Sequence, residues 1–158
     1  MPFDPQITDV PSDQPIRIFL VDDQLIVRRG LAMLFSTEPD LLVCGGAGRA
    51  AEAMLKIVPA QPDLVVVDLV LEEGDAFDLI TALRRKLPAL KILVFSTHRE
   101  PSFVVRAMRA GADDYIPKDE SPQNIIQAIR ELTRELVRET VPKRYEELPI
   151  PVVAGDVR

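Results

Sequence analysis

The stretch IFLVDDQLIVRRG, residues 18–30, joins an apolar run to a helical pattern through two adjacent carboxylates. Its apolar run does not alternate with polar residues, which indicates a strand buried on both faces. The run ends in two adjacent carboxylates, Asp22 and Asp23, and a helical pattern follows in which Arg28 and Arg29 point away from the apolar stripe. Adjacent carboxylates at the end of a buried strand repel each other and lose hydration, so they require a compensating charge.

The same alternation of apolar runs and helical patterns continues along the chain. Runs rich in branched residues predict strands at about 16–21, 41–44, 64–67, 91–95 and 115–116. Amphipathic patterns predict helices at about 24–36, 49–57, 76–86, 102–110 and from about 122. Five such β-α units predict the α/β class, specifically a flavodoxin-like, doubly wound five-stranded parallel sheet. The expected strand order is 2-1-3-4-5, with five flanking helices.

The two ends of the chain differ from this central part. Residues 1–13 are rich in proline and predict a mobile N-terminal extension. Residues 14–136 make up the predicted domain. Residues 137–158 predict a C-terminal tail or interdomain linker, because they contain three further prolines and no clear periodic pattern near the end.

Composition limits the possible functions. A length of 158 residues, 47% hydrophobic and 28% charged, is typical of one globular domain. No apolar run is long enough for a membrane helix, and the N-terminus has no export signal. The net charge of −6 argues against nucleic-acid contact by this chain as it stands. A single cysteine, Cys44, fits a reducing cytoplasm, and we interpret it as a small hydrophobe in a strand.

Polar residues follow the predicted strands at the point where each strand ends. Asp22 and Asp23 follow the first strand, Asp68 the third, Ser96 the fourth and Lys118 the fifth. In a parallel sheet these ends share one edge, so three carboxylates, a hydroxyl and an ammonium should meet there. Oxygen ligands and clustered negative charge are what a hard divalent cation requires, and we therefore predict a Mg²⁺ site.

Four linked motifs resemble one known family. The segments LVDD (20–23), VVVDL (65–69), VFST (94–97) and GADDYIPKD (111–119) occur in the order and spacing of the receiver domain of two-component response regulators. The resemblance covers about residues 14–135. The details STH and KD are most similar to the subfamily joined to a LuxR/NarL-type helix-turn-helix domain.

The resemblance implies a phosphoacceptor and a metal site. Asp68 corresponds to the aspartate that accepts a phosphoryl group. Asp23 would bind Mg²⁺ directly and Asp22 through water, and the backbone carbonyl of Val70 would complete the protein ligands beside Asp68.

The resemblance also assigns the polar residues around the acceptor. Lys118 would pair with the phosphoryl group, Ser96 would donate its hydroxyl to it, and Tyr115 would rotate inward as Ser96 moves. Each has a plainer interpretation: Lys118 as a solvated loop lysine, Ser96 as a turn residue and Tyr115 as core packing. His98, the only histidine, is expected to be an exposed loop residue rather than a catalytic one.

The partners implied are a sensor histidine kinase or a phosphotransfer protein, with a possible homodimer after phosphorylation. The chain would not be a turnover enzyme, although it would assist its own phosphotransfer and dephosphorylation. The expected output face combines the fourth helix, fifth strand and fifth helix and includes Phe103, Arg106 and Arg109. Two alternatives stay open: the input half of a DNA-binding regulator whose helix-turn-helix lies outside this chain, and a metal-dependent aspartyl-phosphate phosphatase. The phosphatase class usually carries an Asp-x-Asp pattern at its first strand, which VDDQ lacks.

Overall fold

The computed structural model describes residues 14–147. The predicted mobile extension at 1–13, and residues 148–158 of the predicted tail, lie outside that range. The strands are β1 Ile16–Val21, β2 Leu41–Ala47, β3 Leu64–Val67, β4 Lys91–Ser96 and β5 Asp114–Pro117. The helices are α1 Leu25–Ser36, α2 Ala50–Ala60, α3 Ala76–Lys86, α4 Pro101–Ala110 and α5 Pro122–Glu147.

The strands form one parallel sheet in the order β2-β1-β3-β4-β5, which confirms the predicted topology. The strand order reverses next to β1, because β1 pairs with both β2 and β3. The carboxyl ends of β1 and β3 are therefore adjacent, which is where an open parallel sheet usually binds its ligand. None of the described helices is both long and apolar enough to span a membrane.

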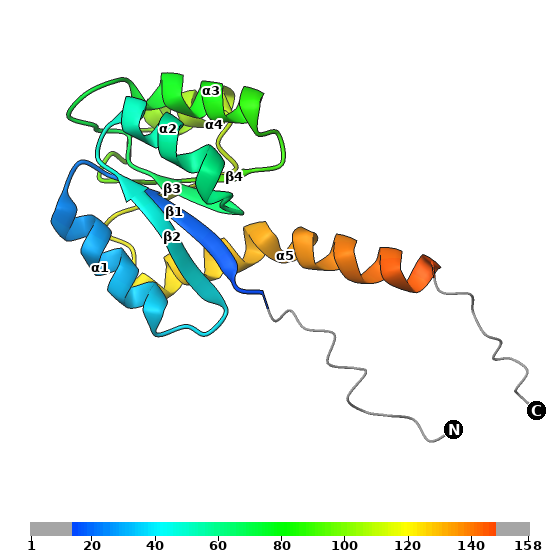
Figure 1. Cartoon of the computed structure of the whole chain (residues 1–158). Helices are drawn as coiled ribbons and strands as arrows, with labels where there is room; N and C mark the ends of the chain where they lie inside the picture. Colours follow the sequence, from blue (N-terminus) through cyan, green and yellow to red (C-terminus); the bar gives the residue numbers. More distant parts are fainter. Residues whose placement is uncertain (1–13, 148–158) are drawn as a thin grey trace, which may run out of the picture.

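Helices cover both faces of the sheet (Figure 1), and each face has its own core. On one face, Phe19 and Val65 pack with the buried residues of α2, α3 and α4. On the other, Ile18 and Leu20 pack with α1 and α5. All four residues of β3 are buried, so its continuous apolar run reflects burial on both faces, as predicted.

Strand β2 is longer than predicted because glycines continue it to Ala47. Glycine has a low strand propensity, so sequence patterns end the strand at Cys44. Gly45 is required by its neighbour, since a Cβ atom there would lie 2.7 Å from Cε2 of the Phe19 ring. The pairing of β1 with β2 shifts register at this point, between Ile18 and Phe19.

Two helices also run beyond their predicted ends. Helix α2 continues through Pro59 to Ala60, although the proline removes the hydrogen bond that an N–H would donate to Leu55; it lies one residue before the end of the helix, where no further turn follows. Leu55 is exposed, so water can satisfy its carbonyl. Helix α5 continues to Glu147, so the first part of the segment expected to be a tail or linker is helical. The helix extends past the end of the sheet (Figure 1).

Candidate functional site

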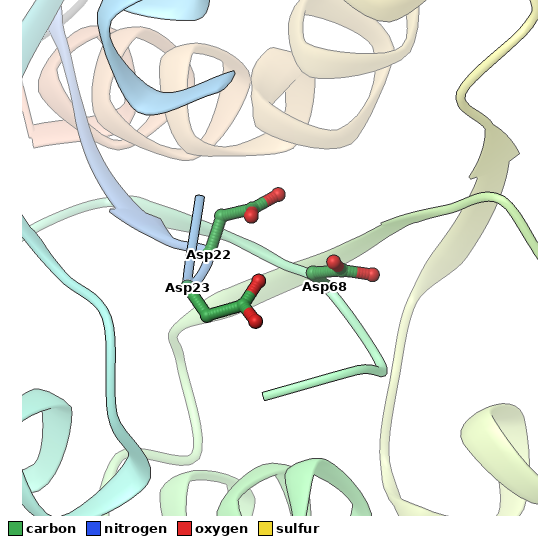
Figure 2. Close-up of side chains that lie close together, drawn as sticks. All are labelled: Asp22, Asp23 and Asp68. Atoms are coloured by element: carbon green, nitrogen blue, oxygen red, sulfur yellow. The ribbon is translucent and has the colours of Figure 1, made fainter. Parts of the chain in front are cut away.

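The predicted strand-end carboxylates meet at the carboxyl edge of the sheet. Asp22 follows β1 and Asp68 follows β3, and both are almost completely buried, with 3% and 5% of their surface exposed. Asp23 is half-buried beside them. One carboxylate oxygen from each of the three lies within 4.8 Å of the others. Figure 2 shows the side chains of Asp22 and Asp23 extending from the end of β1 toward the side occupied by Asp68.

Lys118 contributes the only side-chain cation in direct contact with these carboxylates among the described residues. Its Nζ donates to Oδ2 of Asp22 at 2.7 Å and to Oδ2 of Asp68 at 3.0 Å. Its backbone N–H donates to the carbonyl of Ser96 at 2.8 Å, which fixes the start of the β5–α5 loop against the end of β4. Lys118 is therefore not a solvated loop lysine.

Burial and the ammonium act in opposite directions on the acceptor carboxylate. Burial raises the pKa of Asp68, the hydrogen bond from Lys118 opposes this, and the nearby charge of Asp22 adds to it, so the pKa lies above its ordinary value of 3.8. For Lys118, burial disfavours the ammonium, but the bonds to Asp22 and Asp68 outweigh it and raise the pKa above 10.5. One ammonium faces three carboxylates, so the site retains negative charge.

Asp22 is held by hydrogen bonds on every side. Its N–H donates to the carbonyl of Ala47 at 3.1 Å, and its Oδ1 accepts from the N–H of Gln24 at 2.9 Å. Its backbone carbonyl accepts from Nη1 of Arg28 at 2.5 Å. Arg29 is exposed, as predicted, whereas Arg28 is half-buried and folds back toward the site. The helical pattern, in which Arg28 points away from the apolar stripe, gave no sign of this contact with Asp22.

The carboxylate of Asp23, unlike that of Asp22, has no bonding partner among the described residues. It makes no hydrogen bond or ion pair with any other described residue. An unpaired carboxylate next to two buried ones is costly unless a cation joins it. The available ligands are oxygen atoms without sulfur or imidazole, which is the set that Mg²⁺ prefers over softer metals. The residues present therefore fit the predicted ion.

Ser96, Tyr115 and His98 form a second group beside the carboxylates. Ser96 is fully buried, and its Oγ accepts from the N–H of His98 at 3.2 Å. The Tyr115 hydroxyl donates to the carbonyl of His98 at 2.6 Å, and burial raises the pKa of Tyr115. Tyr115 also packs against the core shared with Phe103. Tyr115 is therefore half-buried, between this core and the β4–α4 loop.

His98 is less exposed than predicted. Its ring stacks on Phe103 with centroids 4.3 Å apart and planes inclined by 12°. Its Nδ1 lies 3.5 Å from a carboxylate oxygen of Glu100. The aromatic contact is the physical reason for the difference, because it shields one face of the imidazole from water. His98 therefore packs beside the site and does not contact Asp22, Asp23 or Asp68.

The loop after Asp68 is anchored to α2. The N–H of Val70 donates to Oδ1 of Asp68 at 3.4 Å, and Val70 as a whole is 49% exposed. Farther along, the carbonyl of Glu73 accepts from the N–H of Ala50 at 3.2 Å. Gly74 follows with φ of +92°, and a Cβ atom there would lie 2.5 Å from the Cβ of Ala50. Glycine is thus required where this loop touches α2.

Comparison with known proteins identifies this arrangement. The family model for the response regulator receiver domain matches residues 18–130, which include all the strands except the first residues of β1. The chain belongs to the response regulator receiver domain family. This family receives phosphoryl groups and does not consist of turnover enzymes, so the receiver interpretation replaces the phosphatase alternative.

The relatives of this receiver domain belong to the subfamily suggested by the STH and KD details. The DNA-binding transcriptional activator DevR/DosR of Mycobacterium tuberculosis is 35% identical over 117 residues, covering 74% of this chain and 54% of that protein. A LuxR-family two-component response regulator from Aurantimonas is 32% identical with a TM-score of 0.70, covering 81% of this chain and 99% of that one. The receiver domain of the putative response regulator NarL from Mycobacterium tuberculosis is 26% identical with a TM-score of 0.72. That match covers 77% of this chain and 98% of the other.

The curated relatives are longer than this receiver domain. The chain spans a little over half of the length of DevR/DosR and of the response regulator VraR of Staphylococcus aureus, at 54% and 57%. The shared part is the receiver. The rest of each of those proteins lies outside the match with this chain.

Proposed function

We propose that this receiver accepts a phosphoryl group on Asp68 from a phosphohistidine of a sensor histidine kinase or phosphotransfer protein, and that the modified receiver controls an output. One observation carries the proposal: a buried aspartate lies within 4.8 Å of two further carboxylates and within 3.0 Å of an ammonium, on the edge where a parallel sheet binds ligands. This combination suits a carboxylate nucleophile with charge stabilisation around it.

The proposed reaction moves a phosphoryl group from an imidazole nitrogen of the donor to a carboxylate oxygen of Asp68. A carboxylate oxygen of Asp68 forms a bond to phosphorus, and the bond between phosphorus and the donor's imidazole nitrogen breaks, with the electron pair leaving on that nitrogen. Lys118 already contacts Asp68, so its ammonium can stay beside the acceptor and pair with a phosphoryl oxygen. The buried Ser96 hydroxyl is the second donor available to the phosphoryl group.

The metal would be held by oxygen atoms of this cluster. We assign Asp23 and Asp68 as direct Mg²⁺ ligands, Asp22 as a ligand through water, and the carbonyl of Val70 as the remaining protein ligand. The unpaired Asp23 carboxylate supports this assignment. When bound, Mg²⁺ offsets the negative charge that accumulates on the transferring phosphoryl group. Asp22 accepts a hydrogen bond from Lys118 and would so keep the ammonium beside Asp68.

The output is proposed to leave through α4, β5 and α5. A phosphoryl group at Asp68 would draw Ser96 and Lys118 toward it and favour the inward position of Tyr115, which contacts the β4–α4 loop at His98. Reversing a two-state population from 1:99 to 99:1 requires about 5.5 kcal/mol of differential binding, which several charge-assisted contacts in a buried site can provide. The surface affected includes Phe103, Arg106 and Arg109, where a partner or a second copy could dock.

The biological output is proposed to be transcription regulation in the cytoplasm. The relative DevR/DosR is a DNA-binding transcriptional activator, and its match to this chain spans about half of its length. We therefore propose that this receiver acts as the input half of such a regulator. Because this chain carries a net charge of −6, we assign DNA contact to a separate domain rather than to the receiver itself.

Labelling with a small phosphodonor tests the function. The chain should incorporate one phosphoryl group from acetyl phosphate with Mg²⁺, and the label should be stable in acid and labile in base. Asp68→Asn keeps the shape but removes the nucleophile, so it should not be labelled. Asp119→Asn, at an exposed aspartate near the site, is the matched control and should be labelled normally. Undiminished labelling of Asp68→Asn would refute the assignment.

A further inference from the structure

The peptide group between Asp22 and Asp23 connects the two neighbouring carboxylates of the site. Its oxygen is the Asp22 carbonyl, which accepts a hydrogen bond from Nη1 of Arg28 at 2.5 Å. Asp22 is also fixed by Ala47, Gln24 and Lys118. Asp23 has no side-chain partner among the described residues, so the direction of its carboxylate depends on the backbone that carries it.

Arg28 reaches that peptide through a space left by two glycines. Gly46 and Gly48 lie at the end of β2 and just beyond it. A Cβ atom on Gly48 would lie 3.2 Å from Nη1 of Arg28, and one on Gly46 would lie 3.5 Å from its Cδ. The first of these distances is tighter than an ordinary van der Waals contact, so a side chain at 48 would push the guanidinium by a few tenths of an ångström, whereas the second is an ordinary contact. Glycine at 48 therefore leaves room for the guanidinium, and the stem of the arginine lies over Gly46.

We propose that Arg28 is a positioning residue for the Mg²⁺ site: its guanidinium fixes the Asp22–Asp23 peptide and thereby aims the Asp23 carboxylate at the metal. This inference rests on the proposed function, because it assumes that Asp23 is a metal ligand. Groups outside the ligand set that orient ligands commonly determine metal affinity in proteins. Here the oriented group is the backbone of the ligand rather than its side chain.

Charge and positioning predict opposite effects when Arg28 is removed. A guanidinium near the site repels a divalent cation, so loss of its charge alone would strengthen Mg²⁺ binding. Loss of positioning would weaken binding, because the freed peptide lets Asp23 sample directions that do not reach the metal. We expect positioning to dominate, since the hydrogen bond is direct and Arg28 is half-buried.

The experiment measures Mg²⁺ affinity of the unphosphorylated full chain by amide NMR titration. Arg28→Ala should weaken Mg²⁺ binding by about tenfold, at the lower end of the range for groups that orient metal ligands. Arg28→Lys should recover part of this affinity. The matched control is Arg29→Ala, at the adjacent exposed arginine, which should bind Mg²⁺ like the wild type. In the metal-free state, only the Arg28 variants should shift the amide resonance of Asp23 strongly.

A second variant distinguishes loss of the Arg28 contact from a general loss of stability. Gly48→Ala should weaken Mg²⁺ binding in the presence of Arg28 and have little further effect in Arg28→Ala, because both changes act on the same contact. In phosphorylation by acetyl phosphate, Arg28→Ala should raise the Mg²⁺ concentration for half-maximal rate more than it lowers the rate at saturating Mg²⁺.

Three outcomes would overturn the inference. Unchanged or tighter Mg²⁺ binding in Arg28→Ala would show that the arginine does not position Asp23. Equal effects of Arg28→Ala and Arg29→Ala would indicate a general charge effect. Absence of Mg²⁺ binding and labelling in the wild type would instead refute the proposed function, and the inference with it. Either of the first two outcomes, with a wild type that binds Mg²⁺ and is labelled, would refute the inference alone.

Discussion

Nζ of Lys118 lies 3.0 Å from Oδ2 of Asp68, although β4 separates the strands that carry the two residues. The lysine reaches across the end of β4, with its ammonium 5.9 Å from the centre of the Phe95 ring. Both partners are shielded from solvent, with 14% and 6% of their side chains exposed. This ion pair, together with the bond to Asp22, joins β1, β3 and β5 at one point.

Lys118→Met should destabilise the protein in Mg²⁺-free buffer. The change leaves buried carboxylates without their cation, and we expect a loss of about 3 kcal/mol in the free energy of unfolding, measured with urea. Added Mg²⁺ should recover part of this loss because it binds the folded state. Lys56→Met, which removes an exposed pair with Glu52, should change the free energy of unfolding far less. Equal losses for the two variants would contradict this account of the ion pair.

Asp23→Asn should have opposite effects on metal binding and on stability. Mg²⁺ binding and labelling by acetyl phosphate should disappear together, because the proposed direct ligand is lost. In Mg²⁺-free buffer the variant should be more stable by about 1 kcal/mol, since one of three clustered negative charges is removed. Calorimetric titration and urea unfolding measure the two effects. Asp119→Asn is the control, and retained labelling of Asp23→Asn would place the metal elsewhere.

Tyr115→Phe should weaken the connection between the site and α4. It removes the hydrogen bond to the His98 carbonyl and keeps the ring, at an expected cost of about 1 kcal/mol in the free energy of unfolding. Beryllofluoride, a phosphoryl mimic, should shift amide resonances of the wild type through residues 99–118. In the variant, shifts around Asp68 should persist while those in α4 diminish. Identical shift patterns in the two proteins would exclude a role for the hydroxyl in the switch.

Arg130 holds the end of the α1–β2 connection against α5. Its guanidinium donates to Asp40 at 2.9 Å and to Glu38 at 2.8 Å, and its hydrogen bond lowers the pKa of Asp40 below 3.8. A carboxyl whose pKa is lower in the folded state adds stability above its unfolded pKa and loses it as the pH falls through the folded value. Arg130→Ala should therefore cost about 0.5–1 kcal/mol at pH 7, because the pair is largely exposed.

The difference between wild type and Arg130→Ala should shrink as the pH falls below 3.8, because Asp40 is then protonated first in the unfolded chain and, at a lower pH, in the folded protein. Urea unfolding at pH 7 and at pH 3 measures it. The exposed Arg134 lies one turn later on the same helix, and Arg134→Ala serves as the control that should show little change at either pH. A difference that stays constant with pH would show that the pairing with Asp40 contributes nothing.

The positions of Asp22, Asp68, Ser96 and Lys118 could be predicted from the sequence because one physical rule determines them. Asp22 and Asp68 directly follow the apolar strands β1 and β3, Ser96 ends β4, and Lys118 follows the short, partly buried strand β5. Parallel strands end at a common edge, and the alternation of strands and helices predicted a parallel sheet. The site therefore required only the correct detection of where four strands end.

Arg28, His98 and the end of β2 were not predictable by the same rule. Arg28 occupies a polar helical position, and its contact with Asp22 uses the space beside Gly48, about which a helical pattern carries no information. The stacking of His98 on Phe103 depends on how the β4–α4 loop turns. The end of β2 was not predicted because its last residues include glycines, which are uncommon in strands. The reason for glycine at 45 is the ring of Phe19, which leaves no room for a side chain there.

Chemical trapping identifies which aspartate carries the phosphoryl group. The wild-type chain is incubated with acetyl phosphate and Mg²⁺, reduced with borohydride, which converts an aspartyl phosphate to homoserine, digested and sequenced by mass spectrometry. The account predicts homoserine at position 68 and unmodified aspartate at 22 and 23. Without Mg²⁺, or in Asp23→Asn, the homoserine should be absent. Homoserine at any other aspartate, with position 68 unchanged, would contradict the assignment of Asp68 as the phosphoacceptor.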